Sequence, residues 1–270
     1  MSTYGPETYG ERNADVYDEW HADLDPTDAV QCLAGLIEEG PAGPVLELAV
    51  GTGRVTIPLA ERGVDLRGID ASEAMVAHMR AKPGGDQIPV AIGDMADVDP
   101  GTDDRFAMIF VVFTTFFFLM TQEDQVRCFA NVARRLLPGG RFVLECLVPD
   151  LARYQRQQSV DAHRVDHDHV RLVAVRHDPV DQRFDGQHIL ITNEGIRLAP
   201  VSMRYAWPSE LDLMARLSGL HRRHRWGGWR REPYLGTGTH VTIYEKPADE
   251  EQLARNRAAR PDSQHAAPAR

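Results

Sequence analysis

Short apolar runs alternate with amphipathic segments through the first half of the chain. The apolar runs have the length of buried strands, and the segments between them carry apolar residues at helical spacing. The expected strands cover residues 45–50, 64–69, 88–92, 106–113 and 141–148, and the expected helices cover residues 28–39, 55–62, 71–82 and 123–137. This alternation predicts an α/β fold with a doubly wound, mostly parallel sheet.

The pattern changes after residue 149. Alternating apolar and polar positions within 160–206, with turn signals at 178–179, 185–186 and 193–195, predict an antiparallel β insertion after the fifth strand. A helix at 208–219 and two antiparallel edge strands, 220–226 and 240–244, complete a sheet of about seven strands. We therefore expect lid helices (1–40), a sheet core (41–150), the insertion (151–207), a C-terminal helix with the last two core strands (208–246) and a disordered tail (247–270).

A glycine turn, Gly51-Thr-Gly53, ends the first expected strand, and Asp70 ends the second. Such a turn lets backbone N–H groups approach a ligand, and a carboxylate at the next strand end accepts hydrogen bonds from ribose hydroxyls. This arrangement is typical of adenosine-type cofactor sites. A dinucleotide site favours a third glycine, but this chain has Thr56 there, and Glu47 within the first strand needs a partner.

Residues 47–53, Glu-Leu-Ala-Val-Gly-Thr-Gly, resemble the first motif of class I S-adenosylmethionine-dependent methyltransferases, with Ala49 where glycine is more usual. Two further motifs follow in the order of that family: Gly93-Asp94-Met95 ends the third strand, and Leu136-Leu-Pro-Gly-Gly140 precedes the fifth. The resemblance covers about residues 44–148. It implies a Rossmann-like fold, S-adenosylmethionine as the cofactor and S-adenosylhomocysteine as the product.

The resemblance also implies a set of cofactor-binding residues at the carboxyl ends of the strands. Asp70 is expected to hold the ribose, Asp94 the adenine amino group, and Glu47 the cationic amino-acid end of the cofactor. The alternatives are a helix N-cap for Asp70, a turn former for Asp94 and a core residue for Met75. The full expected set is Glu47, Ala49, Gly51, Gly53, Asp70, Ala71, Met75, Asp94, Met95 and Phe113.

The methyl acceptor is expected beside the N-terminal segment and the run 113–119. Tyr17 resembles a lid tyrosine of glycine and sugar-amine N-methyltransferases, which implies that it orients the acceptor; the alternative is a hydrophobic lid without chemistry. Similar sugar-amine enzymes have a histidine where this chain has Phe118, which removes a candidate general base and favours an apolar or aromatic acceptor, or catalysis by proximity alone. The expected acceptor-binding residues are Tyr9, Thr114, Phe117, Phe118, Trp207 and Trp229.

Composition narrows the range of partners. A formal net charge of −10 disfavours a nucleic-acid backbone, although the basic, aromatic segment 221–231 keeps RNA binding as an alternative. Three scattered cysteines indicate reduced thiols in a cytoplasmic protein. Histidines at 163, 167 and 169 match no common zinc pattern, so no metal is expected. The chain shows neither a signal pattern nor an apolar run long enough to span a membrane.

The sequence therefore predicts a methyltransferase that acts on a nitrogen, oxygen or carbon atom of a small molecule. By analogy, we place it in bacterial specialised metabolism, that is, natural product biosynthesis. We expect a monomer or a homodimer. Two alternatives use the same fold: an RNA-modifying methyltransferase, and a scaffold or cyclase that binds the cofactor without transferring its methyl group.

Overall fold

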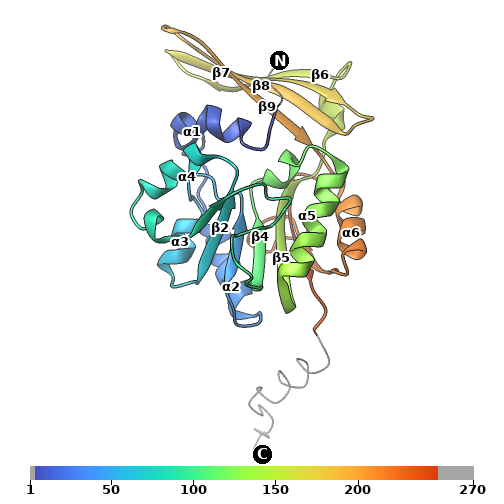
Figure 1. The fold of residues 1–270 in the computed structure, drawn as a ribbon. Coiled ribbons are helices and arrows are strands. Elements are labelled where there is room, and N and C mark those ends of the chain that lie inside the picture. Colours follow the sequence, from blue (N-terminus) through green and yellow to red (C-terminus); the bar gives the residue numbers. More distant parts are fainter. Residues whose placement is uncertain (1–3, 249–270) are drawn as a thin grey trace, which may run out of the picture.

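The computed structural model describes residues 4–248, and a seven-stranded sheet forms their centre (Figure 1). The strand order is β10-β11-β5-β4-β1-β2-β3. Strands β1 to β5 are parallel, β11 is antiparallel to β5, and β10 is antiparallel to β11. The strands are β1 (Val45–Leu48), β2 (Leu66–Asp70), β3 (Val90–Ile92), β4 (Phe106–Val111), β5 (Leu136–Leu147), β10 (His221–Trp226) and β11 (Thr239–Glu245). The predicted Rossmann-like α/β fold is confirmed.

Helices cover both faces of this sheet (Figure 1). They are α1 (Thr8–Trp20), α2 (Thr27–Glu38), α3 (Thr56–Glu61), α4 (Glu73–Arg80), α5 (Gln122–Arg135) and α6 (Pro208–Leu217). Side chains cap the starts of two of them: Thr121 Oγ1 accepts a hydrogen bond from Asp124 N (3.0 Å) at α5, and Ser72 Oγ accepts one from Met75 N (3.1 Å) at α4. Ser72, and not Asp70, is therefore the N-cap of α4.

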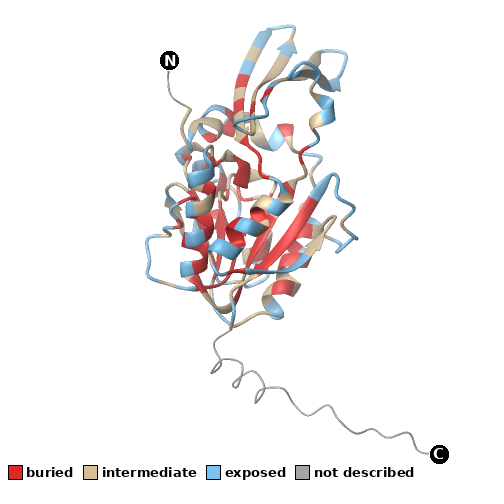
Figure 2. Ribbon diagram, turned by 90° about the vertical axis from the view of Figure 1, so that its right-hand side faces the viewer, coloured by how far each residue is buried: buried red, intermediate tan, exposed pale blue. Residues whose placement is uncertain are grey.

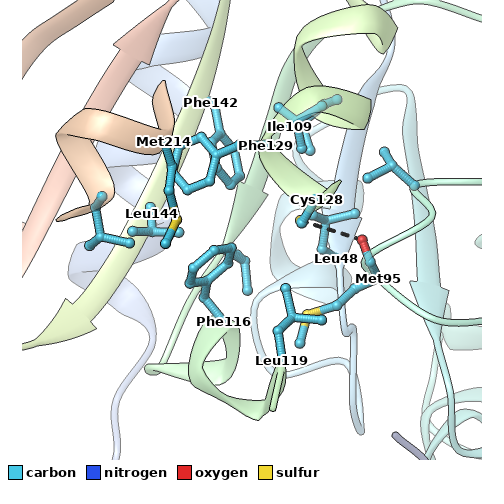
Figure 3. Packing of buried hydrophobic residues seen from close by; sticks show 14 of the residues in the cluster. Leu48, Met95, Ile109, Phe116, Leu119, Cys128, Phe129, Phe142, Leu144 and Met214 are labelled. Atoms are coloured by element: carbon cyan, nitrogen blue, oxygen red, sulfur yellow. Dashed lines mark hydrogen bonds between the residues drawn. The ribbon is translucent and has the colours of Figure 1, made fainter. Parts of the chain in front are cut away.

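The sheet core is mostly apolar (Figure 2), and strand β1, which lies beside the central strand β4, is buried along its whole length. On one face, Phe129 of α5 packs edge-to-face against Phe116 and Phe142, with ring centroids 5.5 and 5.2 Å away (Figure 3). Strand β1 pairs with β2 on one side and with β4 on the other. From β1 the strand order therefore runs first to one edge of the sheet and then, after β3, toward the other edge. Ligands of doubly wound sheets bind at this reversal, beyond the carboxyl ends of the strands.

A second, four-stranded antiparallel sheet lies beside α1, above the carboxyl ends of the main strands (Figure 1). It contains β6 (Gln158–Val165), β7 (His169–Asp178), β8 (Arg183–Thr192) and β9 (Gly195–Arg204), in that order. It is the predicted insertion, but the turn expected at 185–186 is wrong, because Asp185 pairs with Arg176 and Ser202 inside β8. Gly186 serves strand packing instead: a Cβ there would lie 2.9 Å from the Ala174 carbonyl oxygen.

Several boundaries also differ from the prediction. The helix α1 (Thr8–Trp20) lies in the predicted lid segment 1–40 and has no counterpart among the helix ranges predicted above. Strand β5 begins at Leu136, which pairs with Phe106. Leu137, the expected end of a helix, and residues 138–140, expected to precede the strand, therefore belong to the strand. The predicted disordered tail lies, beyond residue 248, outside the described residues. Among residues 4–248, no helix is both long enough and apolar enough to cross a bilayer.

Candidate active site

A cavity of about 560 Å³ lies at the carboxyl ends of β1, β2, β3 and β4, under α1 and the second sheet. Its walls come from segments that are distant in sequence. They include Tyr17 of α1, Gly51 after β1, Asp70 at the end of β2, Phe113 after β4 and His188 of β8. The cavity therefore joins the expected cofactor positions to the expected acceptor positions.

The glycine turn and Asp70 form one end of this cavity. Gly51 has a φ of +56°, and no atom lies within 4 Å of the place where a Cβ would stand, so its backbone faces open space. Asp70 Oδ2 accepts a hydrogen bond from Gly51 N (2.7 Å), and Oδ1 accepts one from Ser72 N (2.8 Å). Burial raises the pKa of Asp70, against the effect of these two bonds. Ala49 and Ala71 line the same end.

Asp94, Met95 and Met75 of α4 line the same cavity. Asp94 Oδ1 accepts a hydrogen bond from Ala96 N (2.8 Å), as a turn former does. Its other oxygen lies 3.6 Å from the Arg127 guanidinium. Burial raises the pKa of Asp94. A carboxyl group can bind the polar edge of an aromatic base, and methionine side chains in the same cavity can contact its faces.

Glu47 of β1 and Gly53 of the glycine turn do not line the cavity. Glu47 is 2% exposed, and Thr56 Oγ1 donates a hydrogen bond to its carboxyl group. Burial raises the pKa of Glu47 to about 8, more than this bond and the Arg54 charge lower it. Gly53 allows close packing, because a Cβ there would lie 2.5 Å from Met79 Cγ.

Aromatic side chains form the other end of the cavity. Tyr9 and Tyr17 come from α1, and Phe118 comes from the segment after β4, with Thr114 beside it. The Tyr9 ring lies 5.0 Å from the Phe118 ring and 6.4 Å from the Tyr17 ring, centroid to centroid. Burial raises the pKa of both tyrosines, so their hydroxyls are neutral hydrogen-bonding groups.

His21 is the residue at this end that the sequence analysis missed. It follows α1 directly, and its ring centroid lies 4.6 Å from that of Tyr17 and 5.2 Å from that of Phe113. Burial is the main cause that lowers its pKa to about 4, and the charges of Arg54 and Arg171 act in the same direction. Its Nε2 has no hydrogen-bond partner among residues 4–248. The spacing of four residues from Tyr17, one helical turn, was the available signal.

Two further histidines from the second sheet line the cavity. Burial lowers the pKa of His188 to about 4 and also lowers that of His163. The three imidazoles are therefore uncharged at neutral pH. Within residues 4–248, no group of three or more His, Cys, Asp or Glu side chains is arranged to hold a metal ion.

The structure places three of the expected acceptor residues away from this cavity. Phe117 is fully buried in the core. Trp207 is 38% exposed and packs edge-on against Tyr205. Trp229 lines a second cavity, of about 400 Å³, and its Nε1 donates a hydrogen bond to Glu145 Oε1 (2.9 Å).

The basic segment 221–231 is neutralised by neighbouring carboxylates. Each of its five arginines has an acidic partner within 4 Å. The pairs are Arg222–Asp212 (2.7 Å), Arg223–Glu245 (3.4 Å), Arg225–Asp212 (2.7 Å), Arg230–Asp28 (2.7 Å) and Arg231–Glu39 (3.0 Å). These ion pairs offset part of the positive charge on which phosphate binding depends.

Comparison with known proteins identifies the family. Residues 45–140 match the model of a methyltransferase domain. The solved structure of the CcbJ methyltransferase from Streptomyces caelestis superposes with a TM-score of 0.83 at 37% identity, over 91% of this chain and all of that one. The chain is a class I S-adenosylmethionine-dependent methyltransferase. Its cofactor is S-adenosylmethionine, as the first motif predicts.

Two curated relatives of the enzyme are also informative. The cypemycin N-terminal methyltransferase of a Streptomyces species is 29% identical over 245 residues, which are 88% of this chain and 97% of the relative. An N,N-dimethyltransferase of dTDP-4-amino-2,3,4,6-tetradeoxy-D-glucose from Saccharopolyspora spinosa is 30% identical over 151 residues, 53% of this chain and 56% of the relative.

The residues at the strand ends fit this cofactor. The backbone of Gly51 faces open space, and the carboxyl groups of Asp70 and Asp94 line the same cavity at the ends of adjacent strands. The volume, about 560 Å³, suits a nucleoside-sized ligand together with a second small molecule. The enzyme can therefore hold cofactor and acceptor side by side in one cavity.

Proposed function

We propose that the enzyme methylates an amine nitrogen of a small molecule in natural product biosynthesis. The observation that carries the proposal is the uncharged imidazole of His21, held between Tyr17 and Phe113 at the acceptor end of the cavity. When bound, the cofactor supplies a sulfonium methyl group that a nucleophile can accept. The protein's own residues have to bind both molecules, align them and manage the proton of the nucleophile.

For the cofactor, Asp70 is the proposed partner of the ribose hydroxyls and Asp94 that of the adenine amino group. Both carboxyl groups keep acceptor capacity after their backbone bonds, since each oxygen has two lone pairs. Met75 and Met95 would contact the base. Glu47 supports the turn from below, through Thr56, because it does not line the cavity.

An amine has to be unprotonated to attack, and the electrostatics of the acceptor end favour that form. The charges of Arg54 and Arg171 lower the pKa of His21, and the same field disfavours an ammonium ion beside it. Among the residues that line the cavity, within 4–248, the carboxylates are Asp70, Asp94 and Asp124. Arg127 contacts both Asp94 and Asp124, which places these two together at the adenine end.

His21 then has a specific task. An amine N–H becomes more acidic as its nitrogen forms the new bond, so a hydrogen bond from it to a neutral imidazole strengthens in the transition state. Tyr17 holds the imidazole by an edge contact and is the proposed orienting group, and Tyr9 and Phe118 form the apolar wall beside it. The proton leaves the methylated nitrogen by way of this imidazole or water.

The names of the relatives support nitrogen over oxygen or carbon. One curated relative is named as a methyltransferase of a peptide N-terminus and another as an N,N-dimethyltransferase of an amino sugar. The paired arginines of 221–231 support a small acceptor rather than RNA. The three free cysteines, Cys32, Cys128 and Cys146, are buried, which supports the predicted cytoplasmic location.

A screen of acceptors tests the proposal. The enzyme is incubated with S-adenosylmethionine and one of four acceptor types: a nucleotide-linked amino sugar, a nucleotide-free amino glycoside, a peptide with a free N-terminus, and unmodified tRNA. Release of S-adenosylhomocysteine with at least one of the three amines, and none with tRNA, supports the proposal. Turnover with tRNA alone would favour the RNA-modifying alternative, and product formation without loss of the cofactor methyl group would favour the cyclase alternative.

A further inference from the structure

The segment that follows β4 has an unusual backbone. Phe113 and Thr114 have φ angles of +58° and +62°, so two consecutive non-glycine residues adopt the left-handed conformation. For L-residues this conformation is sterically unfavourable, and it persists only where surrounding contacts enforce it. Phe113 and Thr114 line both the main cavity and the second cavity, so the strained backbone is the wall between them.

Strand β5 supplies the contacts that enforce this backbone. Glu145 Oε2 accepts a hydrogen bond from Phe113 N (2.6 Å), and the Glu145 carbonyl oxygen accepts one from Thr114 N (3.1 Å). Leu147 N donates a third to Thr114 Oγ1 (3.1 Å). The first bond is the one of the three that a side chain of β5 provides, and a short bond to a carboxylate is stronger than one between neutral groups.

The same carboxyl group reaches a distant loop. Glu145 Oε1 accepts a hydrogen bond from Trp229 Nε1 (2.9 Å), and Trp229 lies in the segment 227–238 between β10 and β11. Burial raises the pKa of Glu145, against these two donors and the charge of Arg54. One side chain therefore joins the segment after β4 to the loop after β10.

Phe113 links this arrangement to the acceptor. Its ring lies against His21 on one side, at 5.2 Å between centroids, and the Arg54 guanidinium lies 4.5 Å from its centroid. A shift of the Phe113 backbone would therefore displace His21, the group proposed to contact the acceptor. Displacement of a reacting group by about 1 Å can cost a hundredfold in rate.

We propose that Glu145 is a positioning residue for methyl transfer, which holds Phe113 and Thr114 in the left-handed conformation and thereby sets His21 against the acceptor. This role rests on the proposed function. Glu145 lines the second cavity and not the main one, and the Phe113 ring that it positions packs against His21, so it acts on turnover more than on cofactor affinity.

Three variants and one matched control test the role. Glu145→Ala removes both side-chain bonds. In Glu145→Gln the amide oxygen can accept one bond, and the amide NH₂ cannot accept the other. Trp229→Phe removes only the bond to the indole. Glu245→Gln is the control, since Glu245 lies on β11 beside Arg141, at the opposite end of the sheet.

The measurements are kcat and KM for an amine that the wild-type enzyme methylates, calorimetric Kd for S-adenosylhomocysteine, and the melting temperature. We expect kcat to fall by about tenfold to a hundredfold in Glu145→Ala, less in Glu145→Gln and least in Trp229→Phe. The Kd of S-adenosylhomocysteine is expected to stay within about threefold of wild type in all of them, a difference below about 0.7 kcal/mol. Glu245→Gln is expected to retain wild-type kcat.

A kcat within about threefold of wild type in Glu145→Gln and Glu145→Ala would overturn the role. So would a loss of cofactor affinity as large as the loss in kcat, because that pattern indicates general disruption of the fold. If Glu145→Ala does not fold, Glu145→Gln decides alone. Turnover of the amine by the wild-type enzyme establishes the proposed function separately, so the two ideas fail in different experiments.

Discussion

Thr56 Oγ1 donates a hydrogen bond to the carboxyl group of Glu47, in the interior beneath the glycine turn. Thr56 stands where a dinucleotide site has its third glycine, and Glu47 stands inside the first strand. The two unusual residues of the motif are therefore partners of each other. This pairing explains how a carboxyl group is tolerated at 2% exposure.

Thr56→Val is expected to destabilise the fold, because valine has the shape of threonine but cannot donate to Glu47. Leaving a buried polar group without a partner costs about 1–3 kcal/mol. The free energy of unfolding from denaturant titration measures the loss. Thr239→Val is the control, since Thr239 is exposed on β11; an equal effect of the two substitutions would contradict the pairing.

The raised pKa of Glu47 predicts a pH dependence of stability. The folded protein holds a proton on Glu47 up to a pH of about 8, whereas an unfolded chain releases it near the ordinary value of 4.5. Stability from this group is therefore fully present below pH 4.5 and is lost as the pH rises to about 8.

Glu47→Gln isolates this contribution, because glutamine does not titrate. The difference in unfolding free energy, wild type minus variant, is expected to decrease steadily between pH 5 and pH 8. The histidines with lowered pKa titrate equally in both proteins and cancel in the difference. A difference that is flat over this range would show that Glu47 is ionised in the folded protein.

Asp70→Ala is expected to weaken the binding of S-adenosylhomocysteine, because the ribose loses its proposed partner. Hydrogen bonds to a charged group contribute about 1.5–3 kcal/mol, which corresponds to roughly a 10- to 150-fold increase in Kd. Calorimetric titration measures it, with Asp103→Ala as the control at an exposed position. Since Asp70 also accepts hydrogen bonds from Gly51 and Ser72, the variant has to be shown to be folded by its melting transition. Normal affinity in folded Asp70→Ala would refute the assignment.

His21→Phe keeps an aromatic ring between Tyr17 and Phe113 but removes the nitrogen atoms. We expect kcat to fall about tenfold, the equivalent of one hydrogen bond of about 1.4 kcal/mol made in the transition state. Cofactor affinity should not change, because His21 lies at the acceptor end. His167→Phe, in an exposed turn, is the control. An unaltered kcat in His21→Phe would remove His21 from the mechanism.

The sequence predicts the parallel core because that information is local: each apolar run, glycine turn and amphipathic helix can be recognised within a few residues. The strand-end positions of Gly51, Asp70 and Asp94 follow directly from this pattern. The prediction of a turn at 185–186 was wrong because Gly186 packs closely against a neighbouring strand, which local sequence patterns do not reveal.

The acceptor end depends on contacts between distant segments, so it was only partly predictable. Trp207 and Trp229 are aromatic residues of plausible type, but Trp207 packs against Tyr205 and Trp229 binds Glu145, away from the main cavity. His21 is the opposite case: in the sequence it is a single histidine after a helix, and only its contacts with Tyr17 and Phe113 and its place in the cavity give it a role. Domain limits and residue roles taken from the sequence stay predictions until ligand complexes are measured.

The proposed N-methylation can be followed with S-adenosylmethionine that carries a deuterated methyl group. The best amine from the acceptor screen is incubated with the enzyme, and the product is fragmented in a mass spectrometer to locate the label. If the enzyme methylates nitrogen, the product carries one deuterated methyl group on the amine nitrogen and forms together with an equal amount of S-adenosylhomocysteine. A label on oxygen or carbon, or consumption of the acceptor with the cofactor intact, would contradict it.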